Sequence, residues 1–169
     1  MIHDPSVFVE ADYVVMESTY GDRDHEDGGD IQQQLEQAIL KTVSAKGNVV
    51  IPTFAVERAQ ELIYHLSGLV HEKRIPDIGI FLDSPMAVDV TEIFRRHRDR
   101  FDAETWNLIT KGSRPLQFPG LTLSRTREQS MAINNLKQPA VIMSTSGMCT
   151  AGRIKHHLKR NVGRPESTI

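Results

Sequence analysis

Cysteine is almost absent from this chain of 169 residues, in which Cys149 stands alone. A lone cysteine excludes an internal disulfide framework and a cysteine-based structural zinc site, and it fits a reducing compartment. No apolar run approaches the roughly 18 residues of a transmembrane helix, which excludes a membrane span. The N-terminus has no basic segment leading into an apolar stretch, so we expect no secretory signal peptide. We therefore expect a cytoplasmic protein without a membrane partner.

Metal-binding patterns are also missing. The seven histidines form neither an HxH pair nor an HExxH motif. The adjacent His156 and His157 would point about 100° apart on a helix, so they do not make a ligand pair. Asp22, Asp24 and His25 lie close together in the sequence, but three such residues do not complete a two-metal site. We expect no metal ion bound by this chain.

Charge is present but unevenly distributed. Residues 1–30 hold nine acids and one base, whereas the remaining residues hold 13 acids and 19 bases. Two clusters concentrate the bases: Arg95, Arg96, His97, Arg98 and Arg100 form one, and Arg153, Lys155, Lys159, Arg160 and Arg164 form the other. Each cluster is compatible with a solvated helix face or with a surface that binds anions.

Apolar segments of two periodicities alternate along the chain. Short β-branched runs predict strands, and apolar residues at helical spacing predict helices between them. The predicted strands are 11–17, 48–51, 78–82, 121–123 and 140–144. The predicted helices are 30–46, 56–73, one through Val88, Ile93 and Phe94, 126–136 and about 150–161. Residues 100–115 predict an irregular connection. The alternation predicts an α/β fold, a mostly parallel, Rossmann-like sheet with helices on both faces.

Polar residues follow the predicted strands at the edge where α/β sheets bind ligands. Glu17 ends the first strand and precedes two hydroxyl residues and a glycine turn. Ser144, Thr145, Ser146 and Gly147 connect the last strand to a helix that displays Arg153. Backbone N–H groups at such a helix start attract phosphate. Both segments are equally compatible with ordinary strand-end turns.

A third strand-to-helix junction carries a cation. Arg58 lies in the first turn of the helix predicted over 56–73, where its charge opposes the helix dipole. Such a base is often held for a bound anion or a buried acid. An exposed arginine whose stem packs on the helix is at least as compatible with the pattern.

These junctions together resemble the β-CASP domain of the metallo-β-lactamase-fold nucleases. The matching stretches are Ala11–His25, Ile51–Leu62, Leu82–Ala87 and Ser144–Arg153, in order over nearly the whole chain. The similarity is closest to the bacterial and archaeal RNA-processing members, which are relatives of the endonuclease subunit of the eukaryotic cleavage and polyadenylation factor.

The resemblance implies a host protein. In that family the β-CASP domain is inserted in a metallo-β-lactamase domain, caps its active site and leaves a cleft for RNA. Two zinc ions bind an HxHxDH motif of the lactamase domain, and a zinc-bridging hydroxide attacks the phosphate. No HxHxDH motif occurs in this sequence. We therefore expect residues 1–169 to be one β-CASP domain excised from a larger protein, inactive by itself, with RNA and the lactamase domain as partners. The β-branched residues near Ile169 resemble the start of a further strand, and homodimerisation is left open.

The resemblance also assigns roles to residues. Glu17 matches the family's motif A acid, which pairs with a downstream catalytic histidine and favours its proton-donating form. Ser144–Gly147 and Arg153 match a segment that lines the RNA cleft, and His25 and Arg58 are expected near it. Three alternatives stay open: a non-catalytic RNA-binding or scaffold module, a DNA-processing β-CASP nuclease, and a free-standing nucleotide-binding domain.

Overall fold

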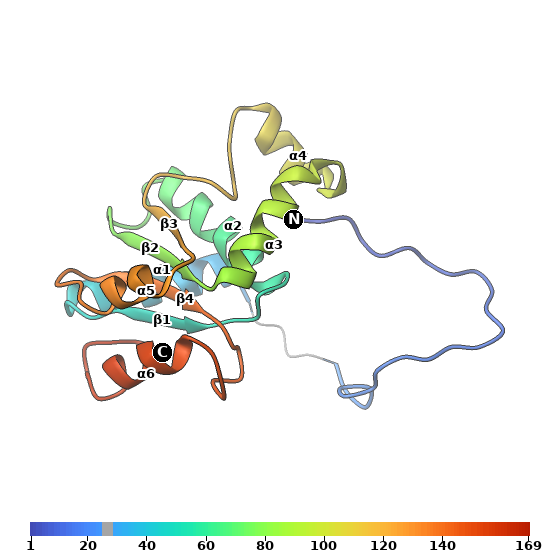
Figure 1. Cartoon of the computed structure of the whole chain (residues 1–169). Helices are drawn as coiled ribbons and strands as arrows, with labels where there is room; N and C mark the ends of the chain where they lie inside the picture. The colour runs from blue at the N-terminus through green and yellow to red at the C-terminus, as the bar shows by residue number, and fades with distance from the viewer. Residues whose placement is uncertain (25–28) are drawn as a thin grey trace.

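A four-stranded parallel sheet organises the chain (Figure 1). The computed structural model describes residues 1–24 and 29–169. The strands, in spatial order, are β1 (Val49–Pro52), β4 (Ala140–Ser144), β2 (Gly79–Asp83) and β3 (Leu121–Ser124). The register aligns Asp83 with both Ser144 and Ser124. The carboxyl ends of β2, β3 and β4 therefore present polar side chains at one edge of the sheet.

Helices cover both faces of this sheet (Figure 1). They are α1 (Ile31–Ser44), α2 (Arg58–His71), α3 (Pro85–Arg96), α4 (Ala103–Thr110), α5 (Arg127–Ile133) and α6 (Ile154–Asn161), with a 3-10 turn, η1, at Arg98–Arg100. Val141 and Met143 of β4 face a core built with α1, α2 and α3. Ala140 and Ile142 face the opposite side, where they pack with Ile133 of α5. Strands buried on both faces explain the runs that lack polar alternation.

Local sequence signals set where the helices begin. Asp30 caps α1 by accepting a hydrogen bond from Gln33 N at 3.1 Å. Ser84 caps α3 in the same way, with Pro85 in the first turn. Thr126 forms a capping box with Gln129 at the start of α5. Each cap satisfies backbone N–H groups that the helix itself leaves unpaired.

The α/β prediction is confirmed, with strands and helices of the described chain within a few residues of those expected. The weak pattern over 100–115 nevertheless contains a helix, α4. Its start is capped by Asp102, which accepts from Thr105 N at 2.8 Å. Thr105 is its one buried residue, so α4 lacks the apolar stripe that a periodicity argument needs.

The strand predicted over 11–17 is wrong. This segment runs as an exposed loop away from the sheet (Figure 1), and Val15 is 98% exposed. A β-strand needs a neighbour to pair its N–H and C=O groups, and none of the described strands lies beside it. The strand expected near Ile169 is present as one parallel bridge, in which Thr168 pairs with Val49 at the outer edge of β1. Among the described residues, no helix is long and apolar enough to cross a membrane.

Candidate functional site

A buried carboxylate stands at the polar edge of the sheet. Asp83, the last residue of β2, is completely buried. Its Oδ1 accepts hydrogen bonds from Ser124 Oγ at 2.8 Å and from Arg153 Nη1 at 2.7 Å. Its Oδ2 accepts from Ser130 Oγ at 2.5 Å and lies 2.7 Å from His157 Nε2. Both oxygens are thus fully engaged, and the carboxylate links β3, α5 and α6 to β2.

The surroundings of Asp83 keep it ionised. Burial acts against the charge, but the hydrogen bonds from His157, Ser130, Ser124 and Arg153 outweigh it and lower the pKa of Asp83 to about 2. His157 is also completely buried, and its Nδ1 lies 3.0 Å from Asn134 Oδ1. Both ring nitrogens therefore face oxygen atoms. The cluster is a buried charge compensated by its own hydrogen-bond donors.

Three of the four motif stretches meet around this cluster. Arg153 of the last stretch bonds to Asp83 of the third, and Thr145 Oγ1 donates to Ser84 Oγ at 3.0 Å. Gly147 lies against the ring of Phe54 from the second stretch, where a Cβ on the glycine would sit 3.1 Å from a ring carbon. The motifs are therefore parts of one edge of the sheet.

The loop that follows β4 folds back on itself. Ser144 is buried and donates from Oγ to the carbonyl of Asp83 at 2.8 Å. Ser146 N donates to Ala151 O at 3.2 Å, and Ile154 N donates to Thr145 O at 3.1 Å. The helix α6 begins at Ile154, whereas the sequence predicted a start at about residue 150. The first N–H of α6 thus already has a partner within the loop.

Arg153 belongs to the Asp83 cluster, whereas Arg58 and Glu17 are exposed residues that make no contact with it in the described part of the chain. The guanidinium of Arg153 points inward and also donates a hydrogen bond to Arg125 O at 2.7 Å. Its side chain is 22% exposed. Arg58 is exposed and pairs with Glu61 at 2.6 Å. Glu17 is exposed, and a hydrogen bond from Thr19 N at 2.8 Å lowers the pKa of its carboxyl group. His25 lies outside the described residues.

Sequence reasoning missed Asp83, Ser124, Ser130, Asn134 and His157 as site residues. A signal for His157 was present, since it shares the buried stripe of α6 with Ile154 and Asn161. A histidine on an inward helix stripe requires a polar partner in the core. Asp83 ends a buried strand at the same edge as Ser144, which is the corresponding signal for the carboxylate.

Replacing Gly152 with alanine is expected to destabilise the chain by more than about 2 kcal/mol. Gly152 has φ +81°, and a Cβ there would lie 2.3 Å from Thr145 O. Gly112→Ala is the matched control, because Gly112 has φ +88° but nothing within 4 Å of its Cβ position. Urea unfolding of both variants separates the cost of the steric clash with Thr145 O from the cost of placing an alanine at positive φ. Equal losses in the two variants would show that the loop accommodates the side chain.

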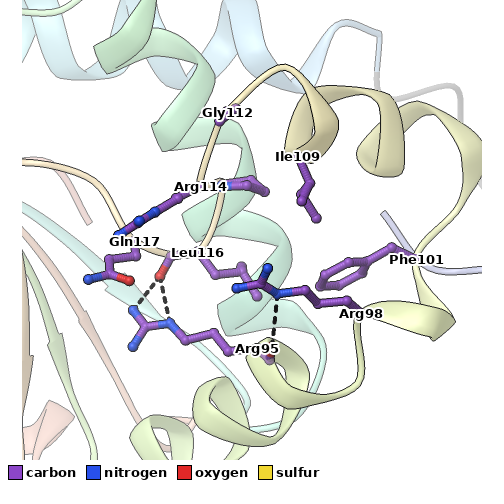
Figure 2. A pocket seen from close by; sticks show the side chains of 10 residues that line it. Arg95, Arg98, Phe101, Ile109, Gly112, Arg114, Leu116 and Gln117 are labelled. Carbon is purple, nitrogen blue, oxygen red and sulfur yellow. Dashed lines mark hydrogen bonds between the residues drawn. The ribbon is translucent and has the colours of Figure 1, made fainter.

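Arg95 and Arg98 of the first basic cluster line a different cavity, of about 320 Å³, between the end of α3 and residues 112–117. Figure 2 shows the guanidinium of Arg95 directed at the carbonyl of Leu116, to which it donates from Nε at 3.2 Å and Nη2 at 2.5 Å. Arg98 donates to Arg95 O at 3.3 Å. Arg95 is therefore a structural residue that ties the 112–117 connection to α3.

Comparison with known proteins identifies the family. The Beta-Casp domain model matches residues 59–169, which include Asp83, Arg153 and His157. The chain belongs to the β-CASP domain family. The resemblance inferred from the four motif stretches is thereby confirmed, and the buried cluster lies within the β-CASP domain.

Relatives of this β-CASP chain carry names from RNA metabolism. It is 39% identical, over all of its residues, to "Ribonuclease TTHA0252" of Thermus thermophilus and covers 39% of that protein. It is 29% identical to "Transcription termination factor FttA" of Methanosarcina mazei, with 99% of this chain and 27% of the relative aligned. It is 28% identical to "RNase J-like protein" of Methanocaldococcus jannaschii, with 89% and 34% aligned. The β-CASP chain thus spans less than half the length of these relatives.

The zinc chemistry implied by the family has no counterpart in the described part of this β-CASP chain. Within residues 1–24 and 29–169, no three His, Cys, Asp or Glu side chains gather as a metal site. His157 and Asp83 are bonded to each other and to serine, arginine and asparagine side chains. We therefore derive no catalytic step through a metal held by these residues.

Proposed function

We propose that this chain is the β-CASP part of a zinc-dependent nuclease that hydrolyses phosphodiester bonds in RNA. In this proposal it covers the active site of a metallo-β-lactamase domain in the same longer protein and holds RNA over it. The observation that carries the proposal is the 39% identity, over the full chain, to a protein named a ribonuclease. The convergence of three motif stretches at one sheet edge supports it, because that edge is where α/β domains bind ligands.

The Asp83 cluster would serve this function by fixing the loop that faces RNA. Arg153 is held by Asp83 and by the carbonyl of Arg125, so it positions the start of α6. The half-buried residues Thr145, Ser146 and Gly147 follow the fixed Ser144 and remain partly accessible. They would offer hydroxyl and backbone groups to phosphate oxygens, the contacts that set the register of a bound nucleic acid.

Glu17 would act at the boundary with the lactamase domain. Its carboxyl group is exposed and has a lowered pKa, so it is an anion near neutral pH. Such a carboxylate would orient a catalytic histidine of the lactamase domain and favour the form that donates a proton to the leaving oxygen. The two zinc ions would be held by that other domain, which places the attacking water outside this chain.

The test compares the chain with the longer protein that contains it. We expect the chain alone to bind a fluorescein-labelled single-stranded RNA, to contain no zinc by elemental analysis, and to leave the RNA intact. We expect the longer protein to cleave the same RNA and to lose that activity when a chelator removes zinc.

Other results would favour other functions. Binding of RNA without cleavage by the longer protein would indicate a scaffold module. Preferential cleavage of DNA of the same sequence would indicate a DNA-processing nuclease. Thermal protection of the chain by ATP or GTP, without RNA binding, would indicate a nucleotide-binding domain. About two zinc ions per isolated chain would overturn the assignment of the metal to another domain.

A further inference from the structure

A groove of about 560 Å³ runs between α5 and α6, on the sheet face opposite to α1 and α2. Residues spaced by one helical turn form its two walls. Arg127, Met131 and Asn135 belong to α5 and the residues that follow it, and His156, Lys159 and Arg160 belong to α6. We call this feature the α5–α6 groove.

The floor of the α5–α6 groove belongs to the Asp83 cluster. Ser130, Asn134 and Arg153 line the groove, and each of them also takes part in that cluster. Ser130 and Arg153 bond to the Asp83 carboxylate, and Asn134 faces His157. The two helices are thus held by a buried network at the bottom of the groove, so the spacing of the walls is fixed before any ligand binds.

The cations on the walls form no direct ion pair with a described acid, and Glu128 is the neighbouring acid that interacts electrostatically with Arg127. Arg127, Lys159 and Arg160 make no ion pair within the described part of the chain, whereas Arg74 and Arg125 elsewhere are paired. The sequence reinforces this: no Asp or Glu occurs between Glu128 and Glu166, while six Lys and Arg do. A chain with 22 acids and 20 bases overall therefore lines one of its grooves with cations.

We propose that the α5–α6 groove binds the sugar–phosphate backbone of single-stranded RNA, as a second contact surface beside the loop after β4. The proposal rests on the proposed function. Arg127 lies on the α5 wall and Lys159 and Arg160 lie on the α6 wall, so a strand lying in the groove can meet cations on both of its sides. The groove begins at Arg153, which also bonds to Asp83, so it continues from the site at the sheet edge.

The lining chemistry favours RNA over an acidic protein segment. Met131, which is 55% exposed, is the one apolar side chain among the described residues that line the groove. Protein partners are usually held through several buried aromatic or aliphatic residues, and this groove offers such residues little apolar surface to pack on. A nucleic acid strand needs mainly cations and hydrogen-bond donors, and one apolar side chain suffices to contact a base or a ribose.

The test measures RNA binding by the full 169-residue chain. The probe is a 12-nucleotide oligouridylate with a 5′-hydroxyl and a 3′-fluorescein, followed by fluorescence anisotropy at several salt concentrations. The variant is Arg127→Gln with Arg160→Gln, both exposed residues at opposite ends of the groove. We expect about tenfold weaker binding and a salt slope reduced by about 1.4, as the loss of two phosphate contacts predicts.

The matched control is Lys41→Gln with Lys111→Gln, two exposed cations outside the groove. The control removes the same number of positive charges. An equal loss of RNA binding in both variants would therefore overturn the proposal for the groove and indicate only general electrostatic attraction. Displacement of the RNA by polyglutamate at equal charge concentration would also overturn it, in favour of an acidic protein partner. If the unaltered chain fails to bind the RNA, the proposed function itself fails. If the unaltered chain binds and the groove variant binds equally well, only the groove proposal fails.

Discussion

Asp83→Ala is expected to destabilise the chain by about 3–5 kcal/mol, the usual cost of breaking a buried ion pair from one side. The substitution would leave the Arg153 guanidinium and the His157 ring without their carboxylate, and the Ser124 and Ser130 hydroxyls without their acceptor. The total free energy of unfolding of a domain of this size is only about 5–15 kcal/mol. Urea unfolding followed by circular dichroism measures the loss as a shift in the midpoint.

Asp89→Ala is the control for this prediction. Asp89 also pairs with an arginine, Arg125, but its side chain is 64% exposed. An exposed pair contributes about 1 kcal/mol or less. A similar loss of stability in the two variants would contradict the view that burial makes Asp83 decisive.

The Asp83 cluster also predicts a dependence of stability on pH. The pKa of Asp83 is about 2 in the folded chain, below its ordinary value of 3.8. A carboxyl group with a depressed folded pKa stabilises the fold above its unfolded pKa, and this contribution is lost as the pH falls through the folded pKa. The difference in unfolding free energy between the natural chain and Asp83→Asn should therefore shrink as the pH falls from about 4 to about 2. A constant difference over this window would show that ionisation of Asp83 does not matter.

The second large effect is expected on catalysis. Glu17→Gln in the longer protein should lower the rate of RNA cleavage by about a hundredfold or more, the range of general acid–base contributions. RNA binding should be unchanged, because the amide keeps the size of the side chain and Glu17 is not among the basic residues proposed to bind phosphate. Single-turnover cleavage and anisotropy measured on the same preparation separate the two effects.

The structure makes the Glu17 variant informative. Glu17 is exposed, and among the contacts of the described chain its carboxylate bonds only to Thr19. Its replacement should therefore leave the stability of this domain unchanged, so lost cleavage could not be attributed to unfolding. Glu10→Gln, another exposed acid of the same segment, is the control and should retain full activity. Cleavage by Glu17→Gln at the rate of the control would remove Glu17 from the proposed mechanism.

Local signals account for most of what the sequence predicted correctly. The start of the helix predicted over 30–46 and the apolar spacing of the helix predicted over 56–73 are encoded within a few residues of each helix, and α1 and α2 are found there in the structure. The strand predicted over 11–17 failed because β pairing depends on a neighbour that no local pattern specifies. The helix α4 was missed because its residues carry no apolar stripe.

The candidate site was predicted less completely than the fold. The loop after β4 was identified from its residues, but the partners of its arginine were not. Arg153 and Asp83 are separated by 70 positions, and His157 and Asp83 by 74. Sequence reasoning can place a charge at a sheet edge, but it cannot tell whether that charge meets a ligand or a buried carboxylate of the same chain. The role of Arg153 as a direct RNA contact therefore stays a prediction.

The strand order has a consequence for how the chain acquires its structure. β4 is last in the sequence yet lies between β1 and β2, and β1 pairs with no other strand of the sheet. During synthesis, β1 and the inner edge of β2 cannot form their hydrogen bonds with β4 until residues 140–144 have left the ribosome. Such late, non-local pairing slows folding, and unpaired edges are sites of aggregation. Folding of this domain is thus expected to be a late, cooperative event that depends on the same segment that delivers the loop at the candidate site.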